Sequence, residues 1–222
     1  MNYIFIDFEM HPIDKIHKEQ RKIAYTEIIE FGAVILNDKF EEFAEFKSYV
    51  HPQYSTEILP QYNRLTHITT AMVHKAESFP IVLEKFADWC FQAGEDFKVY
   101  AWSDNDLAQL RNEMRLKEIP VEGKYEKIVN SWYDFQKEYC DLIKLSKPIS
   151  LSTALEILGE DFSGAIHDAL WDARNTARLF ALSQNHEEFE ERKKTLCLFE
   201  EAEPVTVSLG ELFDFSKLNL KS

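Results

Sequence analysis

Acidic residues near both ends of the chain have the types and spacing of a metal site. A helix over residues 167–180 would carry Asp172 on the face it buries, together with Ala169, Ala173, Thr176, Ala177 and Phe180. A carboxylate on such a face is costly unless a cation or another polar group lies opposite. Near the start, residues 3–9 have the pattern of a buried strand, in which Asp7 and Glu9 share one side. Neighbouring carboxylates repel and raise each other's pKa, and a divalent metal removes that cost.

Three short motifs occur in the order of a known family. They are Ile6-Asp7-Phe8-Glu9, then Ala101-Trp102-Ser103-Asp104-Asn105-Asp106-Leu107, then His167 with Asp172 after four intervening residues. Residues 27–34 and 65–69, which lie between the first and second motifs, show weaker similarities to the same family. Over roughly residues 1 to 182, within the size of one domain, the chain resembles the DEDDh-type 3′-to-5′ exonucleases, and most of all the small RNA-trimming members. The resemblance implies an α/β fold with a ribonuclease-H-like mixed β-sheet flanked by α-helices.

The resemblance also implies a reaction, the hydrolysis of phosphodiester bonds from the 3′ end of single-stranded or short RNA or DNA. Two Mg²⁺ or Mn²⁺ ions about 3.5 to 4 Å apart would activate water and stabilise the leaving 3′ oxygen. His167 would accept the proton of the water, and nucleoside 5′-monophosphates would be released. The implied metal ligands are Asp7, which would bridge the two ions, Glu9, Asp106 and Asp172. Together with His167 these four residues form the implied catalytic set.

The position of His167 follows from its spacing to Asp172. Five residues along a helix correspond to a rotation of about 140°, so two helical residues with this spacing cannot face one metal pair. We therefore expect His167 in the loop that enters the helix, turned back over the site. An imidazole has its ordinary pKa near neutrality, which suits a general base.

Several assignments have alternatives. Asp104 and Asp106 could each be the second-motif ligand or a helix cap; similarity to the RNA-trimming members favours Asp106 as ligand and Asp104 as cap. The resemblance also implies that Glu30 is a structural hydrogen-bonding residue and not a metal ligand. The resemblance places Met10, Leu65 and Thr66 against the terminal nucleotide. Met10 departs from the Thr-rich continuation of many proofreading members, and a core-filling role for Met10 is the alternative.

The expected elements place the motifs at strand ends and helix starts. Strands are expected at 3–8, 28–36 and 41–50, and a strand at 97–102 ends at the second motif. Helices are expected at 79–93, 105–117 and 150–158, and a loop at 51–68.

Composition predicts a single domain. The 222 residues, 45% hydrophobic, are sufficient for one core, which we assign to residues 1–184. The start of the chain lacks a basic leader and an apolar span, so we expect neither a signal peptide nor a membrane helix. Cys90, Cys140 and Cys197 have neither zinc nor disulfide spacing and suggest reduced thiols in a cytoplasmic protein.

The net charge of −14 is unusual for a protein that binds long nucleic acid. Residues 11–24 differ, because four basic residues outnumber Asp14 and Glu19 to give a net charge of +2. This stretch is either an ordinary solvated loop or a basic patch beside the first motif, and the balance favours short or single-stranded substrates.

Residues 185–222 form a C-terminal extension beyond the resemblance. Several of its side chains are too apolar for a free tail, so it is expected to pack on the domain or on a second copy in a homodimer. They are Phe189, Leu196, Leu198, Phe199, Leu212, Phe213 and Phe215. The alternative to an enzyme is a degenerate family member that binds nucleic acid or a protein partner without cleaving, and the intact acids and His167 argue against it.

Overall fold

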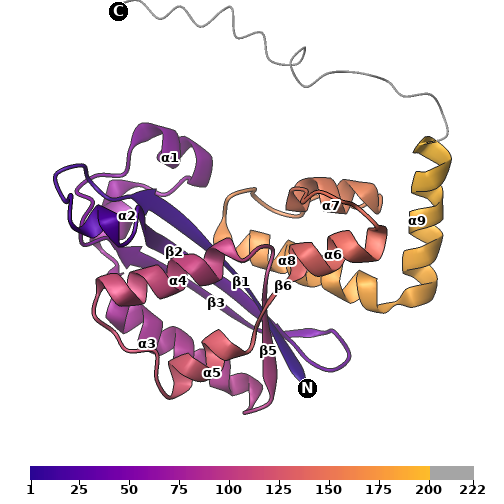
Figure 1. Ribbon diagram of the computed structural model, residues 1–222, viewed down its shortest axis with the longest axis horizontal. Helices are drawn as coiled ribbons and strands as arrows, with labels where there is room; N and C mark the ends of the chain where they lie inside the picture. Colours follow the sequence, from indigo (N-terminus) through magenta and orange to yellow (C-terminus); the bar gives the residue numbers. More distant parts are fainter. Residues whose placement is uncertain (201–222) are drawn as a thin grey trace, which may run out of the picture.

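A mixed β-sheet forms the centre of the structure, a computed structural model that describes residues 1–200 and the side chains of residues 1–193 (Figure 1). The described strands follow the order β4-β3-β2-β1-β5-β6. β1 (Asn2–Pro12), β2 (Thr26–Leu36) and β3 (Glu42–His51) are antiparallel neighbours. β5 (Phe97–Ala101) lies parallel to β1, β6 (Trp132–Asp134) parallel to β5, and β4 (Glu77–Ser78) parallel to β3. β1 is therefore a central strand between β2 and β5, and its carboxyl half extends past its pairing with β5 while it still pairs with β2.

Helices cover both faces of this sheet (Figure 1). One face carries α3 (Phe79–Cys90), α4 (Asn105–Leu116) and α5 (Lys124–Asn130). The other carries α6 (Phe135–Ile143), α7 (Leu151–Ile157), α8 (Ala169–Gln184) and α9 (His186–Glu200). Two short helices, α1 (Pro60–Thr66) and α2 (Thr70–His74), lie beside the loop between β1 and β2.

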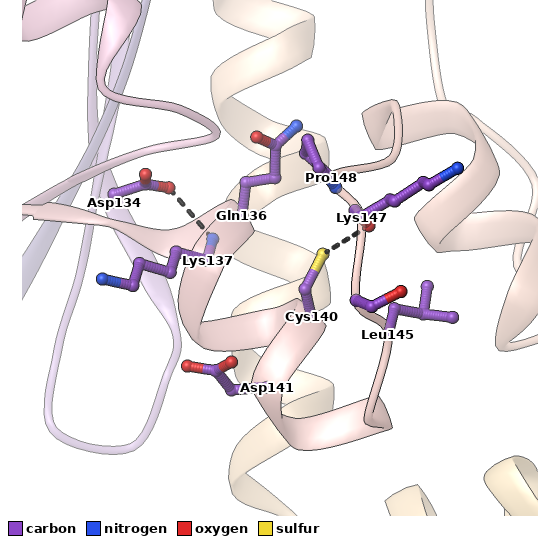
Figure 2. A pocket seen from close by; sticks show the side chains of 9 residues that line it. Asp134, Gln136, Lys137, Cys140, Asp141, Leu145, Lys147 and Pro148 are labelled. Atoms are coloured by element: carbon purple, nitrogen blue, oxygen red, sulfur yellow. Dashed lines mark hydrogen bonds between the residues drawn. The ribbon is translucent and has the colours of Figure 1, made fainter.

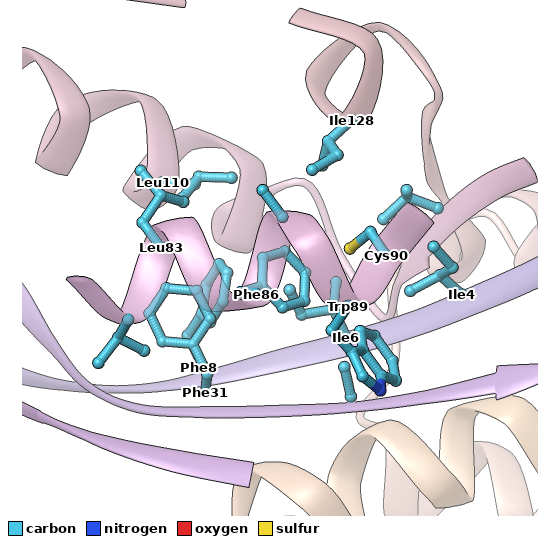
Figure 3. Packing of buried hydrophobic residues seen from close by; sticks show 14 of the residues in the cluster. Ile4, Ile6, Phe8, Phe31, Leu83, Phe86, Trp89, Cys90, Leu110 and Ile128 are labelled. Atoms are coloured by element: carbon cyan, nitrogen blue, oxygen red, sulfur yellow. The ribbon is translucent and has the colours of Figure 1, made fainter. Parts of the chain in front are cut away.

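Residues of β1 alternate between two cores. Ile4, Ile6 and Phe8 pack under α3 and α4 in the core shown in Figure 3, which also contains Phe86 and Leu110. Phe5 points the other way, into a core that α8 completes through residues such as Phe180. The period of a strand therefore puts Asp7 and Glu9 on the face that α8 covers.

The structure confirms the predicted fold class and most long elements, and corrects the shorter ones. The helix expected at 79–93 ends at Cys90, and residues 91–93 form a 3₁₀ turn. The loop expected at 51–68 was wrong in its second half, where Pro60 begins α1 and His67, with φ 59°, ends it. A proline in the first turn is compatible with a helix because its missing N–H would have no partner there. Elements β4, β6, α2, α5, α6 and α9 were also missed.

The described part of the C-terminal extension packs on the domain. Phe189 is buried against Tyr139 of α6, and Arg192 pairs with Glu160. The side chains of Leu196, Leu198 and Phe199, and all of Leu212, Phe213 and Phe215, lie outside the described residues, so a homodimer and the domain boundary at residue 185 stay predictions. In residues 1–200, no helix has the length and apolar character to cross a membrane. Cys90 and Cys140 are buried free thiols, and Cys197 lies outside the described side chains.

Candidate active site

Three of the predicted acidic residues converge at the sheet surface under the start of α8. Asp7 and Glu9 extend from β1 and Asp172 from the first turn of α8, and each offers a carboxylate oxygen within 4.8 Å of the others. Asp172 lies on a helix face that is otherwise buried, as predicted, since Ala169, Ala173 and Thr176 are all shielded from solvent. The polar groups opposite it are carboxylates, and the site therefore has an excess of negative charge.

Gly32 permits this convergence because α8 begins directly above it. Gly32 pairs with Asp7 across β1 and β2, and a Cβ atom at Gly32 would lie 2.0 Å from the carbonyl carbon of Ala169. Any side chain at this position would push the start of α8, and Asp172 with it, away from β1. A glycine inside a strand is a recognised sign of such close backbone approach, and Phe31-Gly32-Ala33 was the available sequence signal.

Polar contacts fix the first turn of α8 on the sheet. Glu30, the partner of Glu9 on β2, accepts a hydrogen bond of 3.1 Å from the Ala169 N–H. Lys47 of β3 lies 3.2 Å from Glu30 and also pairs with Asp168. The Asp168 side chain caps α8 by accepting from the Trp171 N–H at 3.3 Å. Glu30 thus has the structural hydrogen-bonding role that the sequence predicted, whereas Lys47 had no signal because its partners are distant in sequence.

Burial and mutual repulsion make the acidic cluster unfavourable when ionised. Burial is the largest cause that raises the pKa of Asp7, followed by the charges of Asp106, Asp172 and Glu9. Burial, then the charge of Asp172, raises the pKa of Glu9 to about 9. Burial likewise raises the pKa of Asp172 to about 7, although the backbone amides of His167 and Asp168 partly oppose the shift.

The donor set fits a divalent cation with a preference for oxygen ligands. The Oδ2 atom of Asp172 is buried and has no hydrogen-bond partner among the described residues. A buried carboxylate oxygen without a partner is unfavourable in an otherwise folded protein. A Mg²⁺ or Mn²⁺ ion shared with Asp7 and Glu9 would supply the missing contact and offset the charge.

Asp106 is close enough for its charge to act on Asp7, but it does not belong to the group of three carboxylates that lie within 4.8 Å of one another. It is buried at the start of α4, where its Oδ1 accepts a hydrogen bond of 3.1 Å from the Phe8 N–H of β1. Burial raises the pKa of Asp106 to about 7, and this carboxylate is the strongest charge acting on Asp7. Asp104 is exposed at the N-cap position of α4, but its side chain makes no capping hydrogen bond, so the predicted capping contact was wrong. With φ −76° and ψ −5°, Asp104 is already helical, whereas a capping side chain usually requires an extended residue.

His167 lies in the loop immediately before Asp168, as its spacing predicted. Its φ of 63° turns the backbone just before the helix begins. The side chain is exposed, and partial desolvation lowers the pKa of the imidazole. The role of His167 as general base stays a prediction.

The three predicted substrate-binding residues have different environments. Met10 follows a β-bulge and packs, half-buried, against the core that contains Phe8, on the side of β1 away from the acids. Leu65 is 46% exposed on α1. Thr66 is buried, and its hydroxyl donates to the Tyr62 carbonyl and accepts from the Ile68 N–H. The role of all three in substrate binding stays a prediction.

A separate pocket between α6 and the chain that follows it contains none of these residues. Figure 2 shows its lining, in which Cys140 faces the Lys147 carbonyl and Asp134 caps α6 through the Lys137 N–H. Its mixture of lysines, apolar side chains and a buried thiol lacks the clustered carboxylates of the site on β1.

Comparison with known proteins yields one family. A family model described as Exonuclease (RNase_T) matches residues 4–180. The human protein named 3′-5′ exoribonuclease 1 is 32% identical over 160 residues, which cover 69% of this chain and 45% of the relative. The chain thus spans about half the length of that relative. The Bacillus subtilis protein named "Probable 3'-5' exonuclease KapD" is 26% identical over 215 residues, or 97% of this chain and 95% of the relative.

A solved structure shares the same architecture. The nuclease domain of 3′hExo, described as a DEDDh family member bound to rAMP, superposes with a TM-score of 0.70 at 28% identity. The match covers 83% of this chain and 92% of that domain. The residues that the family model matches, 4–180, include all three acidic motifs.

Proposed function

Because this chain belongs to the exonuclease family, in its DEDDh branch, we propose that it is a metal-dependent exonuclease that shortens single-stranded RNA from the 3′ end and releases nucleoside 5′-monophosphates. RNA is favoured over DNA because the human relative is named an exoribonuclease and the similar nuclease domain was solved with rAMP. The observation that carries the proposal is the convergence of Asp7, Glu9 and Asp172 within 4.8 Å around a buried carboxylate oxygen without a partner.

In this proposal each residue has one task. Asp7, Glu9 and Asp172 bind the metal ions, and Asp106 completes the set from α4. The bound ions would supply Lewis-acid activation of the water and charge stabilisation at the scissile phosphate. His167, in its turn before α8, accepts the proton that the attacking water loses. The exposed Leu65 contacts the terminal nucleotide.

Strand shortening tests the proposal directly. Single-stranded RNA and DNA with a label at the 5′ end are incubated in parallel with Mg²⁺, with Mn²⁺ and with EDTA. We expect a ladder that shortens one nucleotide at a time with either metal, faster on RNA, and no cleavage in EDTA. Asp7→Asn should abolish cleavage. Asp38→Asn, the same change at an exposed residue in the turn between β2 and β3, should retain it.

The alternative is a binding protein that no longer cleaves. It predicts that wild-type protein retains labelled RNA in a mobility-shift assay while the strands stay intact with both metals. That combination of results would replace the nuclease proposal.

A further inference from the structure

A groove with a volume of about 420 Å³ lies beyond the carboxyl end of β1, between the loop of residues 13–25 and α1. The loop contributes Ile13, Lys15, Arg21 and Tyr25, and α1 with its N-cap contributes Leu59 and Tyr62. We call this the β1–β2 groove. Its lining contains one acidic residue, Asp14, and none of the clustered carboxylates of the active site, so it is a second feature of the surface. Figure 1 shows its loop beside α1.

The loop has a fixed structure. The Ile13 N–H donates to the Tyr25 carbonyl at 3.0 Å, and the Arg21 guanidinium donates to the Ile13 carbonyl. Arg115 of α4 donates to the Ile23 carbonyl at 3.0 Å. Ile13 and Ala24 are buried in a small core with Leu116 of α4. A groove with walls held in this way loses little conformational entropy when it binds a ligand.

The loop is basic by composition, because four basic residues outnumber Asp14 and Glu19 to give a net charge of +2. The Asp14 carboxylate accepts hydrogen bonds from the Thr56 N–H and hydroxyl, and Glu19 pairs with Lys22. Lys15 and Lys18 are exposed and have no ion-pair partner among the described residues. In a protein with a net charge of −14, this local excess favours a ligand with regularly spaced negative charge.

An aromatic ring is presented beside these lysines. Tyr25 is 62% exposed, and the Arg21 guanidinium lies 4.1 Å from the centre of its ring. An exposed tyrosine stacked on an arginine is a planar surface on which a nucleobase can stack.

Strand β1 links the groove to the acidic site, because the strand that carries Asp7 and Glu9 runs on to Pro12 in the groove lining. Along β1, His11 follows Glu9 after the bulge, and its Nε2 accepts a hydrogen bond of 3.0 Å from the Leu59 N–H. Its ring also packs edge-on against Tyr62, with ring centres 5.0 Å apart. α1 runs from this contact to Leu65, a length of roughly 10 Å for seven residues. A few nucleotides of single strand can span that distance.

We propose that the β1–β2 groove binds single-stranded nucleic acid upstream of the 3′-terminal nucleotide, with a base stacked on Tyr25 and backbone phosphates beside Lys15 and Lys18. The direction of the strand rests on the proposed exonuclease function, whereas binding of the strand does not. The groove then favours substrates that are long enough to reach it. It also reconciles an acidic protein with a polyanionic ligand, because only a short local stretch needs to be basic.

Binding and cleavage are measured separately to test this. The affinity of wild-type protein and of Lys15→Ala/Tyr25→Ala for a fluorescent twelve-nucleotide RNA is measured by anisotropy in EDTA over a range of salt concentrations. We expect the double variant to bind about tenfold more weakly, with a shallower salt dependence, because stacking and a phosphate contact are both lost. Tyr25→Phe should retain the stacking and the affinity. Lys39→Ala, at an exposed lysine in the turn between β2 and β3, is the matched control and should bind like wild type.

Cleavage with Mg²⁺ adds a comparison of lengths. The double variant should show a raised KM for the twelve-nucleotide RNA and an unchanged kcat/KM for a dinucleotide, which is too short to reach the groove. Equal affinity of wild-type protein and double variant for the long RNA, or no measurable binding by either, overturns the inference. Failure of wild-type protein to cleave either RNA overturns the proposed function instead, and the anisotropy result still decides the groove.

Discussion

His167 illustrates how a single residue is placed by the element that follows it. It lies one residue before the Asp168 cap, in a backbone turn with φ 63°, and the imidazole is exposed while partial desolvation lowers its pKa. We expect His167→Ala to lower kcat by about 10²- to 10⁴-fold, the usual contribution of a general base. Calorimetric titration with Mn²⁺ should show nearly unchanged metal affinity, with His186→Ala as an exposed-histidine control. A large loss of metal affinity would instead make His167 a ligand.

Asp104 and Asp106 are distinguished by their surroundings. Asp106 is buried and accepts a hydrogen bond from the Phe8 N–H. Asp104 is exposed, and its side chain makes no capping hydrogen bond. Asp106→Asn should therefore reduce kcat by at least about 10²-fold and weaken Mn²⁺ binding, because a charged ligand is lost. Asp104→Asn should stay within about 0.5 kcal/mol of the wild-type free energy of unfolding and keep activity. The reverse pattern in the same kinetic and calorimetric assays would assign the ligand to Asp104.

Residue spacing was sufficient to predict that Asp7, Glu9 and Asp172 lie together. It was insufficient to predict Lys47, which helps to hold α8 and Asp172 in place. Asp7, Glu9 and Asp172 each interrupt an apolar pattern, so the sequence marks them as unusual. Lys47 is a lysine in a half-exposed strand, where lysines are common, and its importance arises only because the fold brings Glu30 and Asp168 to it. Long-range pairing of this kind leaves no periodic trace in the chain.

At the scale of elements, α8 is held by the sheet at its first turn. Lys47→Met should lower the free energy of unfolding by about 1 to 3 kcal/mol, because Glu30, which is 1% exposed, loses its cation and keeps only neutral partners among the described residues, the Ala169 N–H and the Tyr49 hydroxyl. We also expect lower kcat, since Asp172 and His167 depend on the position of α8. Thermal and urea unfolding measure the first effect and strand shortening the second. Lys47→Arg keeps a cation at this position and should retain most of the wild-type stability and activity. A Lys47→Met protein with wild-type stability would show that Lys47 does not hold α8 on the sheet.

Element length decided which parts of the fold were predictable. α3, α4 and the long strands β1 to β3 repeat their apolar pattern several times, and each was predicted, although β1 continues to Pro12, four residues past its predicted end. β4 has two residues and β6 three, too few for any period to show, and both exist because a neighbouring strand offers hydrogen bonds. α1 was hidden by its polar composition, and its Pro60 was the only local signal.

At the scale of the whole molecule, stability without metal should depend on pH through the acidic site. Burial raises the pKa of Glu9 from 4.5 to about 9 and that of Asp172 to about 7, so the folded protein retains protons that the unfolded chain has released. Between pH 4.5, the ordinary pKa of a glutamate, and about pH 9, the raised pKa of Glu9, the folded state binds more protons than the unfolded state. The free energy of unfolding therefore falls as pH rises through this range. In EDTA we expect the melting temperature to decrease from pH 5 to pH 9.

The Asp7→Asn variant tests whether the acidic cluster causes that decrease in melting temperature. The substitution removes the carboxylate on which Asp106, Asp172 and Glu9 all act. In EDTA at pH 8 the variant should melt higher than wild type, by about 5 °C if repulsion costs 1 to 3 kcal/mol. At pH 5 the difference should shrink, since most of the cluster is protonated in the folded protein. Saturating Mg²⁺ should narrow or reverse the order, because ligand at a hundredfold excess over Kd stabilises wild type by about 2.7 kcal/mol and the variant binds it poorly. Asp38→Asn should follow wild type throughout. A wild-type melting temperature in EDTA that stays level or rises between pH 5 and pH 9 would show that repulsion among these carboxylates does not limit stability. A variant whose advantage persists in saturating Mg²⁺ would show that the carboxylates do not share an ion.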